Sequence, residues 1–170
     1  MVKAIVLYNS HTGNTRKVAM KIAEGLEADC RSNRKIPDLK NYDLIVVGSW
    51  VIMGMLSFAG KRYLKRLKRK NIAGKKVALF FTSGAPDAIN PMTEKSGEPK
   101  IIKDSMFAAM EKAVNKNNQV TILPERFYCI GSAKMFGKNM EKDAIDHPID
   151  EELAQAKVFG EQLKKQLKTQ

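Results

Sequence analysis

Short apolar runs alternate with stretches of helical spacing along the chain. The apolar runs are rich in β-branched and aliphatic residues, which is typical of strands buried on both faces; they cover 3–8, 43–49 and 76–83. Other stretches repeat apolar residues every three or four positions, which predicts helices; they cover 15–28, 57–69, 100–114 and 150–168. Two further segments read as extended, a short polar edge strand at 29–32 and a longer one at 119–130, interrupted by Pro124.

Strands separated by helices predict right-handed βαβ units and a mostly parallel sheet. The fold class is therefore α/β, with helices covering both faces of a doubly wound sheet in three layers. The apolar helix positions are expected to face the sheet, among them Phe58 and Leu64 in the second helix and Ile101 in the third. Segments 84–99 and 131–148 are expected to be long loops.

The size and composition fit an ordinary globular protein. A chain of 170 residues is one domain's worth of sequence, so we expect a single domain over residues 1–170. Cys30 and Cys129 are far apart and belong to no C-x-x-C pattern or zinc-like cluster, which predicts two reduced thiols and no metal site. The first apolar run is shorter than the roughly 7–15 residues of a signal peptide, and no stretch approaches the ~20 apolar residues of a membrane span. We therefore expect a soluble, cytoplasmic protein.

Because ligands of such sheets bind beyond the carboxyl ends of the strands, the segment after the first strand is the first place to search. It contains hydroxyl, amide and glycine residues and then enters a helix; the candidates are Ser10, His11, Thr12, Gly13, Asn14 and Thr15. A helix N-terminus offers unpaired N–H donors and about half a positive charge, which suits a phosphate. The alternative is that these residues only cap the helix.

The type of phosphate ligand is narrowed by what the loop lacks. It has no Gly-Lys-Ser/Thr ending, so it is not a Walker A loop, and it has no G-x-G-x-x-G pattern, which disfavours a dinucleotide. No lysine within the loop is available for the anion. Hydroxyl groups and backbone amides would bind it, which suits a monophosphate.

The motif S-x-T-G-N-T after the strand K-A-I-V-L-Y resembles the phosphate loop of the flavodoxin family. Further blocks follow in the family's order: N-Y-D-L-I-V-V-G-S, G-K-K-V-A-L-F-F-T-S-G, F-Y-C-I-G-S-A-K and H-P-I-D-E-E-L-A-Q-A-K-V-F. The resemblance implies a five-stranded sheet of order 2-1-3-4-5 and non-covalent FMN. It also implies electron transfer through the semiquinone and hydroquinone states of the flavin.

The resemblance assigns the next two loops to the flavin ring. The first flanks one side of the ring; its residues are Ser49, Trp50, Val51, Ile52, Met53 and Gly54. Within it, Gly54 is the candidate for a peptide flip toward N5 of the reduced flavin, and Trp50 is the candidate stacking partner or, alternatively, a core residue at a strand end. The second loop would bind the pyrimidine edge through its backbone; its residues are Thr82, Ser83, Gly84 and Ala85. The alternative for this loop is an ordinary turn.

The net charge of +12 indicates which partners the protein could bind and says little about its fold. Seven of the ten residues from Lys61 to Lys70 are Lys or Arg. One interpretation is a docking surface for an acidic redox protein, and the other is a solvated helix face. Nucleic acid is disfavoured, because no nucleic-acid motif accompanies the cluster.

Two further functions remain open at this point. The block G-S-W-V-I-M-G-M-L-S-F-A-G-K-R-Y-L also resembles flavodoxin-like, quinone-dependent protoporphyrinogen oxidases, so the chain could be a small FMN-dependent oxidoreductase of that kind or an NAD(P)H-dependent reductase. It could also be a flavin-free interaction module on the same sheet. No arrangement of nucleophile and base or of paired carboxylates predicts a catalytic residue.

Overall fold

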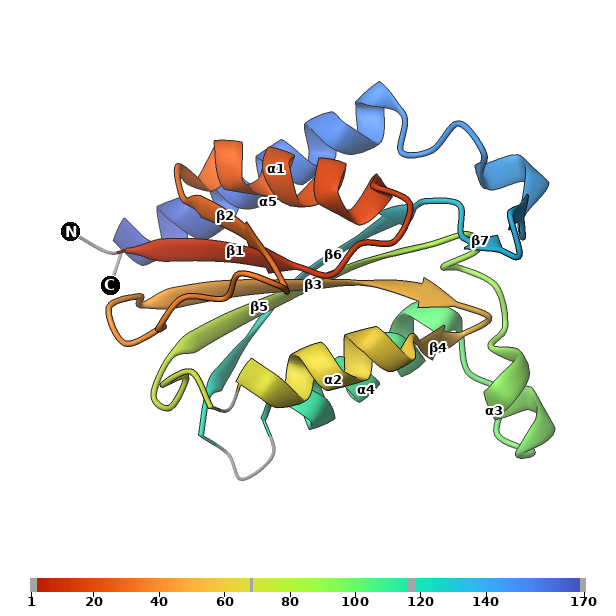
Figure 1. Ribbon diagram of the computed structural model, residues 1–170, viewed down its shortest axis with the longest axis horizontal. Helices are drawn as coiled ribbons and strands as arrows, with labels where there is room; N and C mark the ends of the chain where they lie inside the picture. Colours follow the sequence, from red (N-terminus) through yellow and green to blue (C-terminus); the bar gives the residue numbers. More distant parts are fainter. Residues whose placement is uncertain (1–2, 68, 116–118, 169–170) are drawn as a thin grey trace.

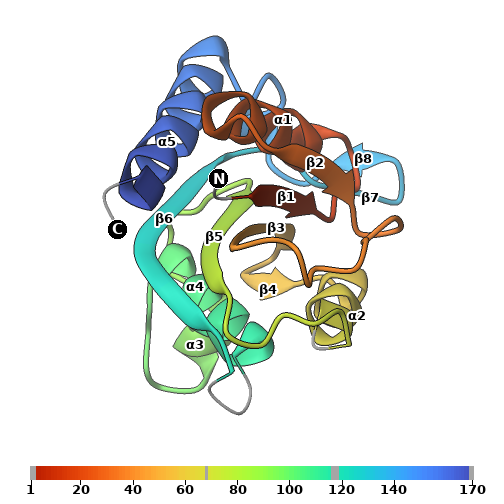
Figure 2. The same cartoon turned by 90° about the vertical axis from the view of Figure 1, so that its left-hand side faces the viewer.

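The computed structural model describes residues 3–67, 69–115 and 119–168. Its centre is a parallel sheet whose five principal strands are β1 (Ala4–Tyr8), β2 (Asp29–Ser32), β3 (Leu44–Ile52), β5 (Lys76–Ser83) and β6 (Thr121–Ile130). One face is covered by α1 (Asn14–Leu26) and α5 (Asp150–Lys168), and the other by α2 (Phe58–Leu67) and α4 (Ile102–Val114) (Figures 1 and 2). The remaining elements are short: β4 (Met55–Leu56), α3 (Pro91–Lys95), β7 (Lys134–Met135), β8 (Lys138–Asn139) and a 3₁₀ turn (Lys142–Ala144).

The strand order is β2-β1-β3-β5-β6, and β4 pairs with β3 outside this path. Since β4 is only a short antiparallel branch, this is the predicted order 2-1-3-4-5, and the three-layer doubly wound fold is confirmed. The interruption expected at Pro124 is a change of register: Val77 pairs with Ile122, whereas Leu79 pairs with Arg126. A proline lacks the N–H that a regular ladder requires, so the strand bulges there.

Two apolar cores lie on the two sides of the sheet. The first, beneath α2 and α4, contains Tyr63, Leu64, Leu67, Met106 and Met110. The second, beneath α1 and α5, contains the predicted stripe of α1 together with residues of α5; its members include Val18, Ala19, Ile22, Ala23, Leu26, Ala156, Phe159 and Leu163.

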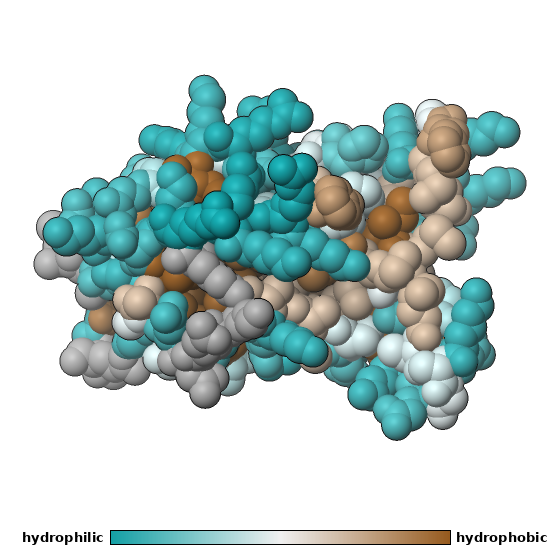
Figure 3. All heavy atoms as spheres, turned by 60° about the horizontal axis from the view of Figure 1, so that its bottom comes forward, coloured by the Kyte–Doolittle hydropathy of each residue, from teal (hydrophilic) through white to brown (hydrophobic). Residues whose placement is uncertain are grey.

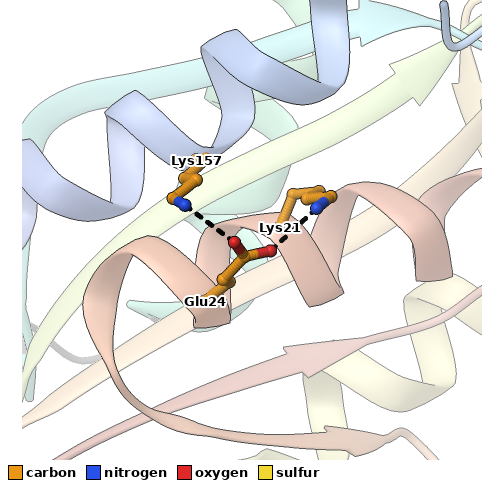
Figure 4. Close-up of polar contacts among 3 residues, drawn as sticks. All are labelled: Lys21, Glu24 and Lys157. Carbon is orange, nitrogen blue, oxygen red and sulfur yellow. Dashed lines mark hydrogen bonds and ion pairs between the residues drawn. The ribbon is translucent and has the colours of Figure 1, made fainter. Parts of the chain in front are cut away.

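The helices α1 and α5 approach each other through two glycines. A Cβ atom on Gly25 would lie 2.0 Å from the carbonyl oxygen of Lys157, and one on Gly160 would lie 2.2 Å from that of Ile22. Beside this crossing, Glu24 bonds Lys157 at 2.7 Å and Lys21 at 2.8 Å (Figure 4). The hydrogen bond from Lys157, followed by that from Lys21, lowers the pKa of Glu24 to about 2.

Two predicted core positions are wrong. Phe58 is 77% exposed, because it is the first residue of α2 and precedes the turn that faces the sheet. Ile101 is 38% exposed, because it precedes α4 and bridges Ile89 instead. Both errors arise from extending a helical stripe to the very start of the helix, at Phe58, or to the residue before it, at Ile101.

Three loop expectations also change. The segment 50–55, expected to be a loop, continues β3 as far as Ile52 and returns as β4, because Val51 and Ile52 pair with Leu56 and Met55. The predicted loop 84–99 contains α3, whose N-cap is Asn90. The predicted loop 131–148 contains the β7–β8 hairpin and the 3₁₀ turn.

Candidate functional site

A hollow lies where the predicted phosphate loop meets the carboxyl ends of β3, β5 and β6. Its walls are formed by His11, Thr12, Thr15, Trp50, Val51, Thr82, Gly131, Ser132 and Ala133. The chain leads from β1 to β2 on one side and from β3 to β5 on the other, so the direction of the strand order reverses between β1 and β3. This is the position at which open α/β sheets bind ligands.

Two backbone amides at the start of α1 point toward the side chain of Ser10 in the β1–α1 loop. Gly13 is the N-cap of α1 at φ 98°, and a Cβ there would meet nothing within 4 Å. The amides of Gly13 and Arg16 both donate to the hydroxyl oxygen of Ser10, at 3.2 and 3.3 Å. Two N–H groups that converge on one oxygen at the start of a 13-residue helix form a geometry suited to an anion.

Other contacts fasten this loop to the strand ends and change the expected roles of its hydroxyl groups. The carbonyl of Ser132 accepts from Thr12 Oγ1 at 3.2 Å and from Asn14 Nδ2 at 3.1 Å. The buried hydroxyl oxygens of Thr15 and Thr82 are 2.8 Å apart. Thr12 Oγ1 donates to Ser132, and the amides of Gly13 and Arg16 donate to Ser10, so an anion would have to replace the Ser10 hydroxyl to accept from these amides.

The first two predicted segments meet in an aromatic stack. The rings of His11 and Trp50 have centroids 5.1 Å apart and planes inclined by 22°. Trp50 is half-buried and lines the hollow, so its position differs from that of an ordinary core residue. Ser49 faces the opposite way: it is fully buried, and a Cβ on Gly60 of α2 would lie 2.7 Å from its Oγ.

Beyond Ile52 the chain turns through Met53 and Gly54, which have φ values of 51° and 70°. The Met53 side chain is 51% exposed. The carbonyl of Gly54 accepts a hydrogen bond of 2.8 Å from Nδ2 of Asn90, at the N-terminus of α3. The turn is therefore fastened to the α3 segment.

The end of β5 brings only Thr82 into the wall of the hollow. The carbonyl of Ser83 accepts from the amide of Gly131 at 3.0 Å, and Ala85 is exposed. A Cβ on Gly84 would lie 2.2 Å from the carboxyl carbon of Glu141. Oε2 of Glu141 is buried and has no hydrogen-bond partner among the described residues.

The sequence analysis did not identify the residues that follow β6, or Glu141, as part of the site. Gly131, Ser132 and Ala133 follow the last strand of the sheet, so the rule that sites lie at the carboxyl ends of parallel strands already pointed to them. Glu141 had no such signal, because its contact with Gly84 joins segments 57 positions apart.

The described residues contain neither a cluster suited to a metal ion nor a reactive thiol. Residues 3–67, 69–115 and 119–168 contain no group of three or more His, Cys, Asp or Glu residues that could hold a metal ion. Both cysteines are free, as expected, and burial raises the pKa of Cys30 to about 11 and that of Cys129 further. In the same ranges, no helix combines the length and apolar character that crossing a membrane requires.

Comparisons with known proteins agree with this geometry. The model of the flavodoxin domain family matches residues 5–161. An uncharacterized protein of Methanocaldococcus jannaschii is 30% identical, over 96% of this chain and 99% of its own.

Solved structures share the fold. A flavodoxin from the domain Archaea superposes with a TM-score of 0.65 at 22% identity, covering 98% of this chain and 99% of its own. A flavoprotein of Lactobacillus acidophilus, solved in complex with FMN, gives a TM-score of 0.54 at 18% identity, over 75% of this chain and 93% of its own. With the family model matching most of the sequence and the sheet order agreeing with it, the chain belongs to the flavodoxin domain family.

Proposed function

We propose that this protein binds one FMN non-covalently at the carboxyl edge of β1, β3 and β5 and transfers electrons through it. The observation that carries the proposal is the convergence of the Gly13 and Arg16 amides on one oxygen at the start of α1. That arrangement fits a monophosphate dianion. The FMN complex of the Lactobacillus acidophilus flavoprotein, which shares this fold, supports the choice of ligand.

The residues around the hollow offer contacts that suit a flavin ring as well as a phosphate. Trp50 supplies an aromatic surface beside the loop, and Gly84 leaves room that Glu141 enters. The unpartnered Oε2 of Glu141 is an acceptor, and the pyrimidine end of a flavin presents an N–H group that suits it. The residues assigned to cofactor binding remain those of the three segments 10–15, 49–54 and 82–85, except Ser49, which faces α2; Gly131, Ser132, Ala133 and Glu141 join them. FMN would supply the redox chemistry, while these residues bind and orient it.

The absorbance spectrum of the purified protein tests this proposal. We expect flavin absorbance after reconstitution with FMN, at a stoichiometry of one per chain, and bleaching on stepwise reduction. A protein that stays colourless after incubation with excess FMN would overturn the proposal and favour the flavin-free interaction module.

The partner that we propose is an acidic redox protein docking on α2. The exposed residues of this helix are mainly cationic, while its inner face is buried; they include Lys61, Arg62, Lys65 and Arg66. Hydrophilic side chains gather over this face in Figure 3. Lys68, part of the predicted cluster, lies outside the described residues. Opposite charge on the partner would speed the encounter.

Charge reversal on α2 should slow electron transfer to anionic acceptors. For Lys61→Glu we expect the rate of reoxidation of the reduced protein by ferricyanide, an anion, to fall about threefold at low salt, and the effect to shrink as salt screens it. Lys168→Glu is the matched control, because Lys168 is also exposed but ends α5, which covers the opposite face of the sheet from α2 (Figure 1). Stopped-flow absorbance measures both rates, and equal slowing by the two variants would count against α2 as the docking site.

A second candidate is a small FMN-dependent oxidoreductase that passes electrons in pairs to or from a small molecule. The observation that favours it is the hydrogen bond by which Asn90 holds the Gly54 carbonyl in the β3–β4 turn. If that carbonyl cannot rotate toward the flavin, the one-electron-reduced flavin is not favoured, and electrons would move in pairs. Steady turnover of a quinone or of NAD(P)H by the purified protein would support this candidate, whereas a carrier would react once and stop without its partner.

A further inference from the structure

The β3–β4 turn, residues Met53 and Gly54, begins three positions after Trp50 and follows the strand that forms one wall of the proposed flavin site. Two peptide groups flank Gly54, and each would have to rotate for its carbonyl to change direction. Both are restrained, for different reasons. Any role of this turn in flavin reduction rests on the proposed binding of FMN.

The first peptide, between Met53 and Gly54, is restrained by Met53. Its backbone is left-handed, with φ 51°. Residues with a Cβ have only a small allowed region at positive φ. Rotating this peptide by half a turn would carry the ψ angle of Met53 into a region that essentially only glycine occupies. A methionine at this position therefore opposes the rotation that a glycine would permit.

The second peptide, between Gly54 and Met55, is restrained by Asn90. Its carbonyl oxygen belongs to Gly54 and accepts the buried 2.8 Å bond from Asn90 Nδ2. Asn90 is itself 2% exposed and fixed by two further bonds, to Oγ of Ser105 at 2.8 Å and from the amide of Met92 at 2.9 Å. A Cβ on Gly54 would lie 2.3 Å from Oδ1 of Asn90, so the turn packs directly against the amide. Rotation would break a buried bond and leave a carbonyl without its partner.

These restraints bear on how a flavin beside the turn is reduced. When a flavin takes one electron from a donor and one proton from water at N5, that nitrogen changes from an acceptor to an N–H donor. A carbonyl that turns toward N5 stabilises this state. We infer that Asn90 is a positioning residue that keeps the Gly54 carbonyl from turning, so that the one-electron-reduced flavin is not favoured. A bound FMN would then pass mainly between its oxidised and two-electron-reduced forms, with a two-electron donor or two successive one-electron transfers supplying the electrons.

Asn90→Ser tests this inference. Serine keeps the N-cap of α3 but is too short to reach Gly54 and adds no charge. We expect the equilibrium constant for forming the one-electron-reduced flavin from the oxidised and fully reduced forms to rise about fivefold, the size associated with releasing one buried hydrogen bond. Absorbance and electron paramagnetic resonance during anaerobic titration of the FMN-loaded protein with dithionite measure it. Ser105→Ala is the matched control: it removes the other acceptor of Asn90 Nδ2, keeps the bond to Gly54, and should leave the constant unchanged.

The outcomes separate the inference from the proposal on which it rests. If the wild-type protein does not take up FMN, the proposed function itself fails. If it binds FMN and most of the flavin is one-electron-reduced at half reduction, or if Asn90→Ser changes nothing, the inference is overturned. Should Asn90→Ser fail to fold, nuclear magnetic resonance of the wild-type Asn90 side-chain amide decides: unchanged shifts on reduction support the inference, and shifts showing loss of the hydrogen bond contradict it.

Discussion

Riboflavin, which lacks the phosphate, should bind this protein at least about 100-fold more weakly than FMN, a difference of roughly 2.7 kcal/mol. The reason is the loop before α1: its amides converge on one oxygen, and the positive end of the helix dipole adds to their attraction for a dianion. Isothermal titration calorimetry with both ligands measures the difference. Equal dissociation constants would show that the loop only caps the helix.

Gly13→Val should abolish most of this preference. Gly13 has a φ of 98°, which a β-branched residue adopts only under strain, so the loop amides would be displaced. FMN affinity should fall toward that of riboflavin, and riboflavin affinity should change little. Gly97→Val is the matched control, because Gly97 has a φ of 82° and equally open space around it but lies beyond α3. If both variants weaken FMN binding to the same extent, general destabilisation is the cause.

Gly25→Ala and Gly160→Ala should each lower the free energy of unfolding by about 2 kcal/mol. The new methyl group would lie 2.0 or 2.2 Å from a backbone carbonyl oxygen of the facing helix, and no side-chain rotation relieves a contact with backbone. Overpacking typically costs about 1–3 kcal/mol, sometimes more, and the roughly 1 kcal/mol that alanine gains over glycine in a helix offsets part of it.

Urea denaturation followed by circular dichroism measures these losses. Lys17→Ala, an exposed position of α1 outside the crossing, should change stability by less than about 0.5 kcal/mol. A stabilising effect of either glycine substitution would mean that α1 and α5 separate readily, and the close crossing would then not be needed for stability.

The sheet could be predicted from the sequence because its central strands are buried on both faces. Ile5, Val46 and Leu79 lie in unbroken apolar runs, and such runs identify parallel strands without knowledge of the rest of the fold. The α1 stripe was equally clear, since every predicted member of it is buried. Local patterns of this kind also singled out the loop that we propose binds the phosphate, because that loop follows the first strand directly.

Features that depend on distant contacts could not be predicted in this way. Val51 and Ile52 extend β3 only because Met55 and Leu56 fold back on them. Nothing in the residues around Asn90 indicates that its amide bonds Gly54, 36 positions earlier. Glu141 meets Gly84 through the packing of two loops, and neither loop has a periodic pattern.

The stack of His11 on Trp50 also has an optical consequence. Trp50 is the only tryptophan in the sequence, so the long-wavelength ultraviolet fluorescence of the protein comes from one indole, at the wall of the hollow. The centroid of the His11 ring lies 5.1 Å from that of this indole, so the emission is sensitive to the geometry of the stack. A flavin arriving beside the same ring would take up its excitation energy. The molecule thus carries a built-in reporter that distinguishes a change at this wall from a change anywhere else in the fold.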